Sequence, residues 1–525
     1  MRPRIAIEVL AMVALVTACA PPAPSPTPPD PVPSVPASEA VATAPAFVDV
    51  PCPDDVTLVM VVVPTCGVLT VEERRDDPGG PEIGVFVTRI DPPSLDAPDP
   101  VVVVGTSLSA PMPHGDVAQV ARRTGRVTYL IDRRGSGLSE PVLTCPEMTA
   151  VEHQTLAWPS LDPAAIEVLS DAAGACRERL VSDGIDPAAY DLAASALDVR
   201  DLRAVLDVEA WNVLAFGSAS RLALEVAHAD PDGVRTLVLD SVVSAGHDDP
   251  IVDIAATAHA LDEIAARCAI DAACAGALPE PGRSLSDALA ALDLDPLIVP
   301  PTEPGTGEVV IDGTRFGRVV RFLMGDRGGE RIPTIMSALE SLGRDEFRGD
   351  DGIVFAIRES TDLCYGRLPD CPDLEVGLML TTVCRDVMPF IGDAPSPDAV
   401  SGLGRAFRLD DWVAVCAAWA VPPAPRDAGA AMLPALPVLM LYGQFDPYTG
   451  PLDRADALLP APGLGLALEV PNETYNAFGY SECPRQVRRA WLDDPTTRVL
   501  DTSCFDVEIA PIRVWIPSAA APPSP

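Results

Sequence analysis

Short apolar runs alternate with amphipathic patterns along much of the chain. The runs are rich in β-branched residues and bounded by turn residues, which predicts buried strands. These strands are expected at 57–63, 83–89, 101–104, 127–131, 213–215, 236–239, 438–442 and 466–470. Between several of them, helical patterns occur at 116–123, 162–182, 192–206 and 222–229. Strands alternating with helices indicate an α/β fold: a mostly parallel central sheet with helices on both faces and an antiparallel start.

The stretch 245–430 interrupts this alternation. It is mostly helical, broken by loops rich in Pro and Gly, with helices expected at 251–268, 284–292, 316–323 and 335–342. We therefore expect a helical lid inserted between the fourth and fifth inner strands. The core would then comprise residues 47–244 and 431–517.

The two ends of the chain lack the features of a packed domain. Residues 1–19 predict an export signal, with Arg2 and Arg4 before an apolar stretch too short to span a bilayer. The signal ends in Val-Thr-Ala-Cys19, which resembles a bacterial lipobox; the alternative is an ordinary secretory signal with a coincidental cysteine. Residues 20–46 begin with a proline-rich run that favours an extended stalk. Residues 518–525 form an unstructured tail. The expected location is the extracytoplasmic face of the cell membrane, with a lipid anchor on Cys19.

Charge excludes several functions. The chain has 37 basic residues, all arginine, against 76 acidic residues, for a net charge of −39. Such a protein repels phosphate backbones, so no nucleic-acid partner is expected. The absence of lysine excludes Schiff-base chemistry, lysine-anchored pyridoxal phosphate, a Ser-Lys dyad and a P-loop lysine. No cofactor is predicted.

The cysteine count suggests disulfides. Thirteen cysteines are present, and setting Cys19 aside for lipid leaves an even number in an exported chain. Spacing suggests the pairs Cys52 with Cys66, Cys145 with Cys176, Cys268 with Cys274, Cys364 with Cys371, Cys384 with Cys416, and Cys483 with Cys504. A metal site is not expected, because neither Cys-x-x-Cys nor His-x-x-x-His occurs.

Four segments carry a resemblance to a known family. Residues 132–141 read Asp-Arg-Arg-Gly-Ser-Gly-Leu-Ser-Glu-Pro, and they are joined by 66–71, 378–391 and 437–449, in that order. These segments resemble α/β-hydrolase-fold exopeptidases, the proline iminopeptidases and secreted tripeptidyl aminopeptidases, over about residues 50–510. The resemblance implies the α/β-hydrolase fold and a Ser, acid, His triad in that chain order.

The triad positions are degenerate. In this fold the nucleophile lies in Gly-x-Ser-x-Gly between a strand and a helix. Matching 212–224 to the family puts Gly217 in the place of the serine. Asp446 stands in the place of the acid, or else simply begins an Asp-Pro turn. Tyr475 stands in the place of the histidine, and no histidine follows position 259. Tyrosine is a poor general base at neutral pH. We expect none of these three residues to be catalytic.

Other residues could substitute for the triad members. Ser218 could cap or pack at the start of the following helix, or act as a displaced nucleophile. Ser107 lies in an elbow-like sequence, but Pro111 and Pro113 follow it. Of the five histidines, His228 suits a helix C-terminus, His114 borders the expected site, and the others carry no pattern, namely His153, His247 and His259.

The sequence supports two hypotheses for the function. The first is a lipid-anchored pseudo-hydrolase that binds a peptide or small-molecule ligand without catalysis. The alternative is an active serine hydrolase or exopeptidase with a rearranged site that uses Ser218 or Ser107. A purely structural envelope protein has nothing in its favour, and the oligomeric state is not predicted.

Overall fold

The computed structural model describes residues 44–54, 56, 63–104, 114–242, 254–277, 281–300, 308–325, 375–391, 409–425, 435–449, 459, 464–475, 482–497 and 499–506. All of them belong to one compact unit, Ala42–Pro525. The expected signal and tail lie outside the described residues, as does the expected stalk up to residue 43. The structure describes residues 44–46 of that expected stalk, and Ala46 is the first residue of a strand. Among the described helices, none is long and apolar enough to cross a membrane.

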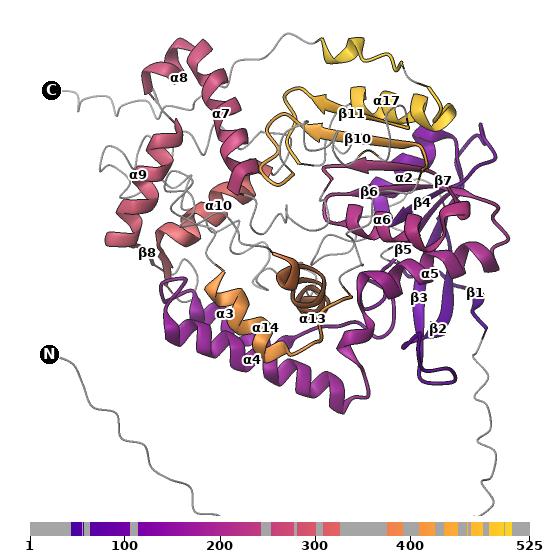
Figure 1. Ribbon diagram of the computed structural model, residues 1–525, viewed down its shortest axis with the longest axis horizontal. Helices are drawn as coiled ribbons and strands as arrows, with labels where there is room; N and C mark the ends of the chain where they lie inside the picture. Colours follow the sequence, from indigo (N-terminus) through magenta and orange to yellow (C-terminus); the bar gives the residue numbers. More distant parts are fainter. Residues whose placement is uncertain are drawn as a thin grey trace, which may run out of the picture. The chain divides into compact units, whose positions relative to one another are not determined.

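A large sheet organises the fold (Figure 1). The described strands follow the order β1-β2-β3-β5-β4-β6-β7-β10-β11 across the sheet. Their bounds are β1 Ala46–Val50, β2 Thr65–Glu72, β3 Glu82–Ile90, β4 Val101–Val104, β5 Thr128–Ile131, β6 Trp211–Phe216, β7 Val234–Asp240, β10 Val438–Gly443 and β11 Gly465–Val470.

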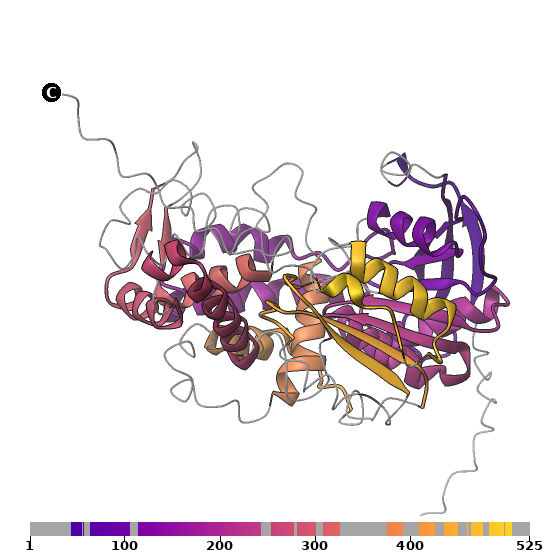
Figure 2. The same cartoon turned by 90° about the horizontal axis from the view of Figure 1, so that it is seen from above.

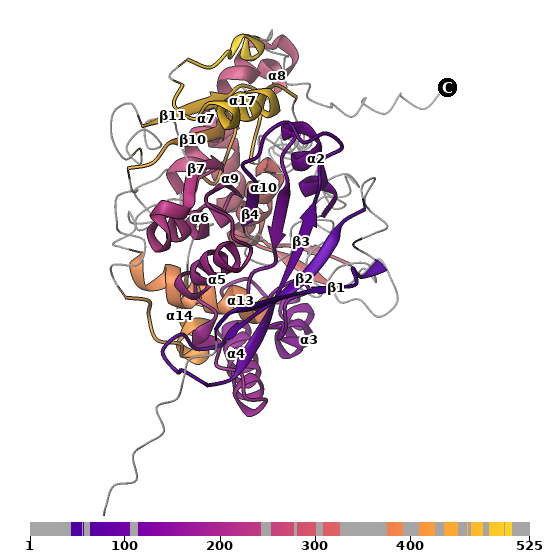
Figure 3. The same ribbon diagram turned by 90° about the vertical axis from the view of Figure 1, so that its right-hand side faces the viewer.

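The pairing directions identify the fold class. Strands β1, β2, β3 and β5 pair antiparallel in succession, and Figure 3 shows the first three side by side. From β5 through β4, β6, β7 and β10 to β11, all pairs are parallel. The crossed order of β4 and β5, followed by parallel strands, is that of the α/β-hydrolase fold. The predicted fold class is confirmed.

Both faces of the sheet are buried, which explains the unbroken apolar runs of the parallel strands. Alternate residues of each strand point to opposite faces. Val102, Val213 and Met440 pack on the face covered by α5 (Leu192–Val205) and α6 (Ala219–Ala229). Val103, Leu214 and Leu439 pack on the other face, against α2 (His114–Thr124) and α17 (Glu482–Asp493). Figure 2 shows α17 lying along β10, which it contacts.

The remaining described helices lie before, between and after these strands. They are α3 Pro146–Thr155, α4 Pro163–Ser182, η1 Pro187–Ala189, η2 Pro231–Gly233, α7 Ile254–Ile270, α8 Ala272–Ala277, α9 Pro281–Leu294, α10 Gly313–Gly325, α13 Val376–Thr381, η4 Thr382–Val387, η5 Met388–Phe390, α14 Asp410–Trp419 and η8 Ser503–Phe505.

A second hydrophobic cluster belongs to the segment expected to form the lid. It joins α7, α8, α9 and α10, which Figure 1 shows grouped together, with a short hairpin of β8 (Leu297–Val299) and β9 (Val309–Ile311). This hairpin was not predicted, because its strands are only three residues long. Phe445, from the loop after β10, is also buried in this cluster. The loop therefore connects the sheet to the helical segment.

Most predicted elements are found within one to three residues of their expected ends. The strand expected at 57–63 and the helix expected at 335–342 lie largely or wholly outside the described residues. Strands β1 and β2 were not among the predicted runs.

Five of the six suggested disulfides are confirmed. They join Cys52 to Cys66, Cys145 to Cys176, Cys268 to Cys274, Cys384 to Cys416, and Cys483 to Cys504. Cys364 and Cys371 lie outside the described residues, and their pairing stays a prediction.

Buried arginines tie the turn after β5 to the elements around it. The fully buried Arg134 donates to both carboxylate oxygens of Asp198 in α5, at 2.6 and 2.7 Å, and to the Glu73 and Ala189 carbonyls. Arg133 donates to the Tyr190 carbonyl and to the hydroxyls of Ser195 and Thr382. The Asp-Arg-Arg-Gly segment that suggested the family therefore has a structural role here.

Asp198→Asn should destabilise the protein strongly, because it leaves the buried Arg134 guanidinium without its carboxylate. Removing one partner of a buried pair costs about 3–5 kcal/mol. Asp183→Asn is the matched control, since Asp183 pairs with Arg179 at 3.6 Å and its side chain is 55% exposed. Denaturant midpoints would measure both. Equal midpoints for the two variants would contradict a structural role for Arg134.

Candidate functional site

Gly217 occupies the sharp turn between β6 and α6. Strand β6 ends at Phe216, α6 begins at Ala219, and Gly217 between them has φ +55°. This left-handed conformation is costly for any residue with a Cβ. The strained strand-to-helix turn is the place where an α/β hydrolase presents its nucleophile. The structure therefore puts Gly217 at the predicted position, and this position has no side chain.

Tyr475 fills the space in front of Gly217. A Cβ built on Gly217 would overlap the Tyr475 hydroxyl oxygen and ring. The two residues are thus direct neighbours across 258 positions of sequence order, as the triad alignment requires. The tyrosine hydroxyl lies where the side chain of a nucleophile would start.

The Tyr475 hydroxyl also accepts a hydrogen bond from a backbone N–H at this turn. It accepts a hydrogen bond from the Ser218 N–H at 3.3 Å. In this fold the N–H of the residue after the nucleophile is one of the two donors that stabilise the oxyanion. The second donor would come from the loop after β4, whose residues 105–113, including Ser107, lie outside the described residues.

Ser218 does not cap helix α6 with its side chain. It stands at the N-cap position with helical angles, φ −59° and ψ −24°, and makes no side-chain capping hydrogen bond. The capping interpretation is therefore wrong, and the alternative that Ser218 packs at the helix start stays a prediction. N-cap residues that cap through their side chains usually have extended backbone angles. Ser218 has helical angles instead, because it directly follows the turn at Gly217.

Asp446 lies in the loop after β10, close to Tyr475. Its carboxylate accepts from the Tyr448 N–H at 2.8 Å and from the Thr449 hydroxyl at 2.5 Å. Burial raises the pKa of Asp446, although these hydrogen bonds and one from Ser241 oppose the rise. Both oxygens thus serve the local turn. The acid position is filled and buried, but its carboxylate is engaged in turn hydrogen bonds.

Tyr475 is poorly suited to accept a proton from a substrate. Burial, followed by the nearby Asp446 carboxylate, raises its pKa above the usual value of tyrosine. A base must be deprotonated to act, so the phenol stays neutral across the physiological range.

Two further residues extend the site, and no sequence motif indicates their roles. The Tyr448 ring packs edge-on against Tyr475 with centroids 5.0 Å apart. The Arg321 guanidinium of α10 lies over the Tyr448 ring, 4.7 Å from its centroid. Arg321 also donates to the Pro447 carbonyl at 3.3 Å. A continuous line of contacts therefore runs from helix α10 to Gly217.

The histidines add no base that the structure places at the site. His228 lies in the last turn of α6, as expected for a cation at a helix C-terminus. His259 lies in α7. His247 and the side chains of His114 and His153 lie outside what the structure describes.

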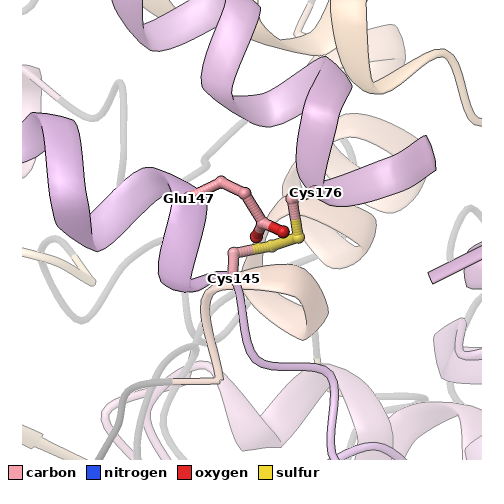
Figure 4. A group of neighbouring side chains, drawn as sticks. All are labelled: Cys145, Glu147 and Cys176. Atoms are coloured by element: carbon pink, nitrogen blue, oxygen red, sulfur yellow. A yellow bond between two sulfur atoms is a disulfide. The ribbon is translucent and has the colours of Figure 1, made fainter. Parts of the chain in front are cut away.

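One group of side chains has the composition of a metal site. Cys145, Glu147 and Cys176 bring their polar atoms within 4.8 Å of one another. Figure 4 shows that the two sulfurs are joined in a disulfide, so neither can act as a thiolate ligand. Glu147 pairs with Arg179 at 2.6 Å. Among the described residues this cluster is therefore a cross-link with an ion pair, not a metal centre.

A family described as TAP-like protein matches residues 405–504. This segment includes Asp446 and Tyr475 but not Gly217. The match and the sheet order support membership of the α/β-hydrolase superfamily and the aminopeptidase-like resemblance. No curated protein matches the chain.

Many solved structures resemble the chain at low identity. A proline iminopeptidase from Mycobacterium smegmatis is 14% identical, with 79% of this chain and 96% of that chain covered and a TM-score of 0.32. A thermophilic esterase from Thermogutta terrifontis is 14% identical, covering 81% and 98%, with a TM-score of 0.32. An α/β-hydrolase fold protein from Chitinophaga pinensis is 13% identical, covering 78% and 94%, with a TM-score of 0.30. Such loose superpositions assign no activity.

Gly217→Ala should destabilise the protein more than backbone strain alone predicts. The left-handed conformation costs about 1–2 kcal/mol for a residue with a Cβ. Overlap with Tyr475 should add about 1–3 kcal/mol, the usual cost of overpacking. Gly184→Ala is the matched control, because Gly184 has φ +84° and open space where its Cβ would lie.

The same substitution should cost less in a Tyr475→Ala background, where only the backbone strain remains. Denaturant midpoints of the four combinations form a double-mutant cycle that isolates the contact. An equal cost of Gly217→Ala in both backgrounds would show that Tyr475 does not fill this space in solution.

Proposed function

We propose that this protein is a catalytically inactive α/β-hydrolase-fold protein, aminopeptidase-like in ancestry, that binds a peptide or small molecule outside the cell membrane. The observation that carries the proposal is the overlap between the Tyr475 hydroxyl and the space of a Cβ on Gly217. A site for acyl transfer needs a nucleophile at this point, and here a tyrosine takes its place.

Three requirements of the hydrolytic mechanism are unmet at the triad positions. Gly217 offers no nucleophilic atom, Tyr475 is not a base, and the Ser218 N–H already donates to Tyr475. Removing a complete triad lowers kcat by about 10⁶-fold in a well-studied protease. In this protein the Ser218 N–H, a potential oxyanion donor, is also hydrogen-bonded to Tyr475. The expected loss of activity is therefore far larger than a modest change in rate.

Ser218 is also poorly arranged as a substitute nucleophile. It begins helix α6 one residue beyond the strained turn. A serine becomes nucleophilic only next to a base. The residue that the family alignment offers as base is Tyr475, whose raised pKa keeps it protonated.

The proposals for the ligand and for the membrane anchor are based on the sequence. The resemblance to exopeptidases suggests a peptide or another small molecule as ligand. Cys19 and the proline-rich stalk suggest attachment to the membrane through lipid.

Wild-type protein should not react with a fluorophosphonate probe, which labels activated serines. The full chain is incubated with the probe, and labelling is quantified by mass spectrometry of the intact protein. Ser218→Ala and Ser107→Ala are compared in parallel. Stoichiometric labelling of the wild type that disappears in one of these variants would identify a working nucleophile and overturn the proposal.

Gly217→Ser with Tyr475→His should introduce weak labelling, since it restores a serine and a base near Asp446. The two changes are needed together, because a serine at 217 would otherwise overlap Tyr475. Gly217→Ser alone should remain unlabelled and be less stable. Strong labelling of this single variant would show that Tyr475 does not block the position.

Cys19→Ala should release the protein from membranes or block its processing. The physical reason is that two acyl chains on Cys19 would supply stable anchoring. Fractionation of the producing cells measures the outcome. Unchanged retention of the variant in the membrane fraction would count against lipidation.

A further inference from the structure

A cluster of arginines forms a basic hollow between helices α2 and α17. The hollow has a volume of about 470 Å³ and is lined by Arg122 and Arg123 from α2 and by Glu482, Arg485, Gln486 and Arg489 from α17. We call this group the arginine groove. It holds four cations and one anion, on a chain whose net charge is −39.

Helix chemistry explains only half of these arginines. Arg122 and Arg123 lie in the last turn of α2, where the helix dipole favours cations. Arg485 lies near the start of α17, where the dipole disfavours them. Arg485 and Arg489 are also four residues apart on one helix, a spacing at which like charges repel. The convergence therefore works against helix stability.

The groove already holds one internal anion. Glu482 pairs with Arg123 across the two helices and lies 3.8 Å from Arg485 on its own helix. Its side chain is 56% exposed, so the carboxylate stands at the mouth of the groove rather than in the core. Within the chain, Arg123 and Arg485 therefore already interact with a carboxylate, which is an oxygen anion.

The α17 side of the groove is firmly held. Val487 and Trp491 are buried against the sheet, and the Trp491 indole donates to the Thr236 hydroxyl at 2.9 Å. Cys483 is cross-linked to Cys504. Arg489 pairs with Asp96 at 3.3 Å and keeps a half-exposed side chain. The guanidinium groups therefore project from a fixed backbone, which lowers the entropic cost of binding a ligand.

We propose that the arginine groove binds a phosphoryl group. Guanidinium groups bind phosphate through paired hydrogen bonds. A phosphate monoester carries up to two negative charges and several acceptor oxygens on one group, whereas Glu482 and Asp96 each supply one charge from separate side chains. The volume lies within the range of small-molecule sites, about 300–1,000 Å³. The phosphoryl group could belong to a free phosphate compound or to a lipid headgroup. This site is separate from the one at Gly217 and does not depend on the proposed loss of catalysis.

The test uses the full chain with Cys19→Ala, so that no lipid anchor interferes with vesicle binding. Inorganic pyrophosphate is titrated by calorimetry at low ionic strength. Binding should weaken about tenfold or more in Arg485→Gln/Arg489→Gln, because hydrogen bonds to charged groups contribute about 1.5–3 kcal/mol each. Glu482→Gln should instead bind more tightly, because it removes the competing carboxylate.

Arg74→Gln/Arg89→Gln is the matched control. It removes two positive charges, as the α17 double variant does. Both arginines are exposed, and each pairs with an aspartate two residues later in the sequence, Asp76 and Asp91. It should leave pyrophosphate binding unchanged, apart from a small loss through the overall field. Thermal melts of all variants verify that they are folded.

The source of the phosphoryl group is tested with vesicles. Sedimentation with phosphatidylglycerol vesicles is compared with phosphatidylcholine vesicles. Binding to phosphatidylglycerol that is lost in the α17 double variant but kept in the control supports a lipid headgroup, and pyrophosphate binding with the same pattern supports a free phosphate compound. No binding in either assay, or equal losses in both double variants, would overturn the proposal.

Discussion

The buried turn after β5 holds together the part of the molecule on which the site depends. Arg134 and Arg133 reach from this turn to α5, to the residues after η1 and to η4, using a buried carboxylate, three carbonyls and two hydroxyls. Arginine suits this role because its guanidinium stays charged when buried and presents several donors in one plane. A chain without lysine has no other strong cation for such a position. None of these hydrogen bonds involves Gly217 or Tyr475, so this network does not depend on which residues stand at those two positions.

The degenerate site is filled by side chains that pack against one another. Arg321 lies over Tyr448, Tyr448 meets Tyr475 edge-on, and Tyr475 lies against Gly217 and the Ser218 N–H. A hydroxyl that accepts from this N–H satisfies a donor that a hydrolase leaves open for its oxyanion. Such an arrangement favours stability over reactivity, since active sites hold polar groups short of partners and pay for this in stability. The line of contacts also joins helix α10 to the elbow, so a ligand that moved this helix would act on the same residues.

The sequence predicted the parallel strands and the helices of the core well, because most of these strands are buried on both faces and are mainly apolar. Strand β11 is the exception, with three half-buried residues and the exposed Glu469. It missed β1, whose residues are mostly exposed or half-buried, the neighbouring strand β2, and the three-residue strands β8 and β9. For the site, chain order and motif spacing were enough to place Gly217 and Tyr475 opposite each other. They could not show that the tyrosine hydroxyl fills the missing side chain's space, or that Arg321 and Tyr448 support it, because these contacts depend on side-chain directions across distant segments. The capping role expected of Ser218 failed for a similar reason: the backbone angles at the turn decide it, and residue type alone does not.

The turn at Gly217 and the arginine groove differ in the charges that they bring together. At the elbow, the local groups are a phenol, a buried carboxylate and a glycine. In the arginine groove, four guanidinium groups converge on a surface of a chain that carries twice as many acids as bases. Local contacts stabilise the first arrangement, because Asp446 is buried and hydrogen-bonded within its turn and the half-buried Tyr475 packs against Tyr448 and Gly217. In the arginine groove the dipole and the spacing of α17 both oppose the cations, and Glu482 and Asp96 offset part of this repulsion. Converging guanidinium groups of this kind are what the proposed phosphoryl site requires.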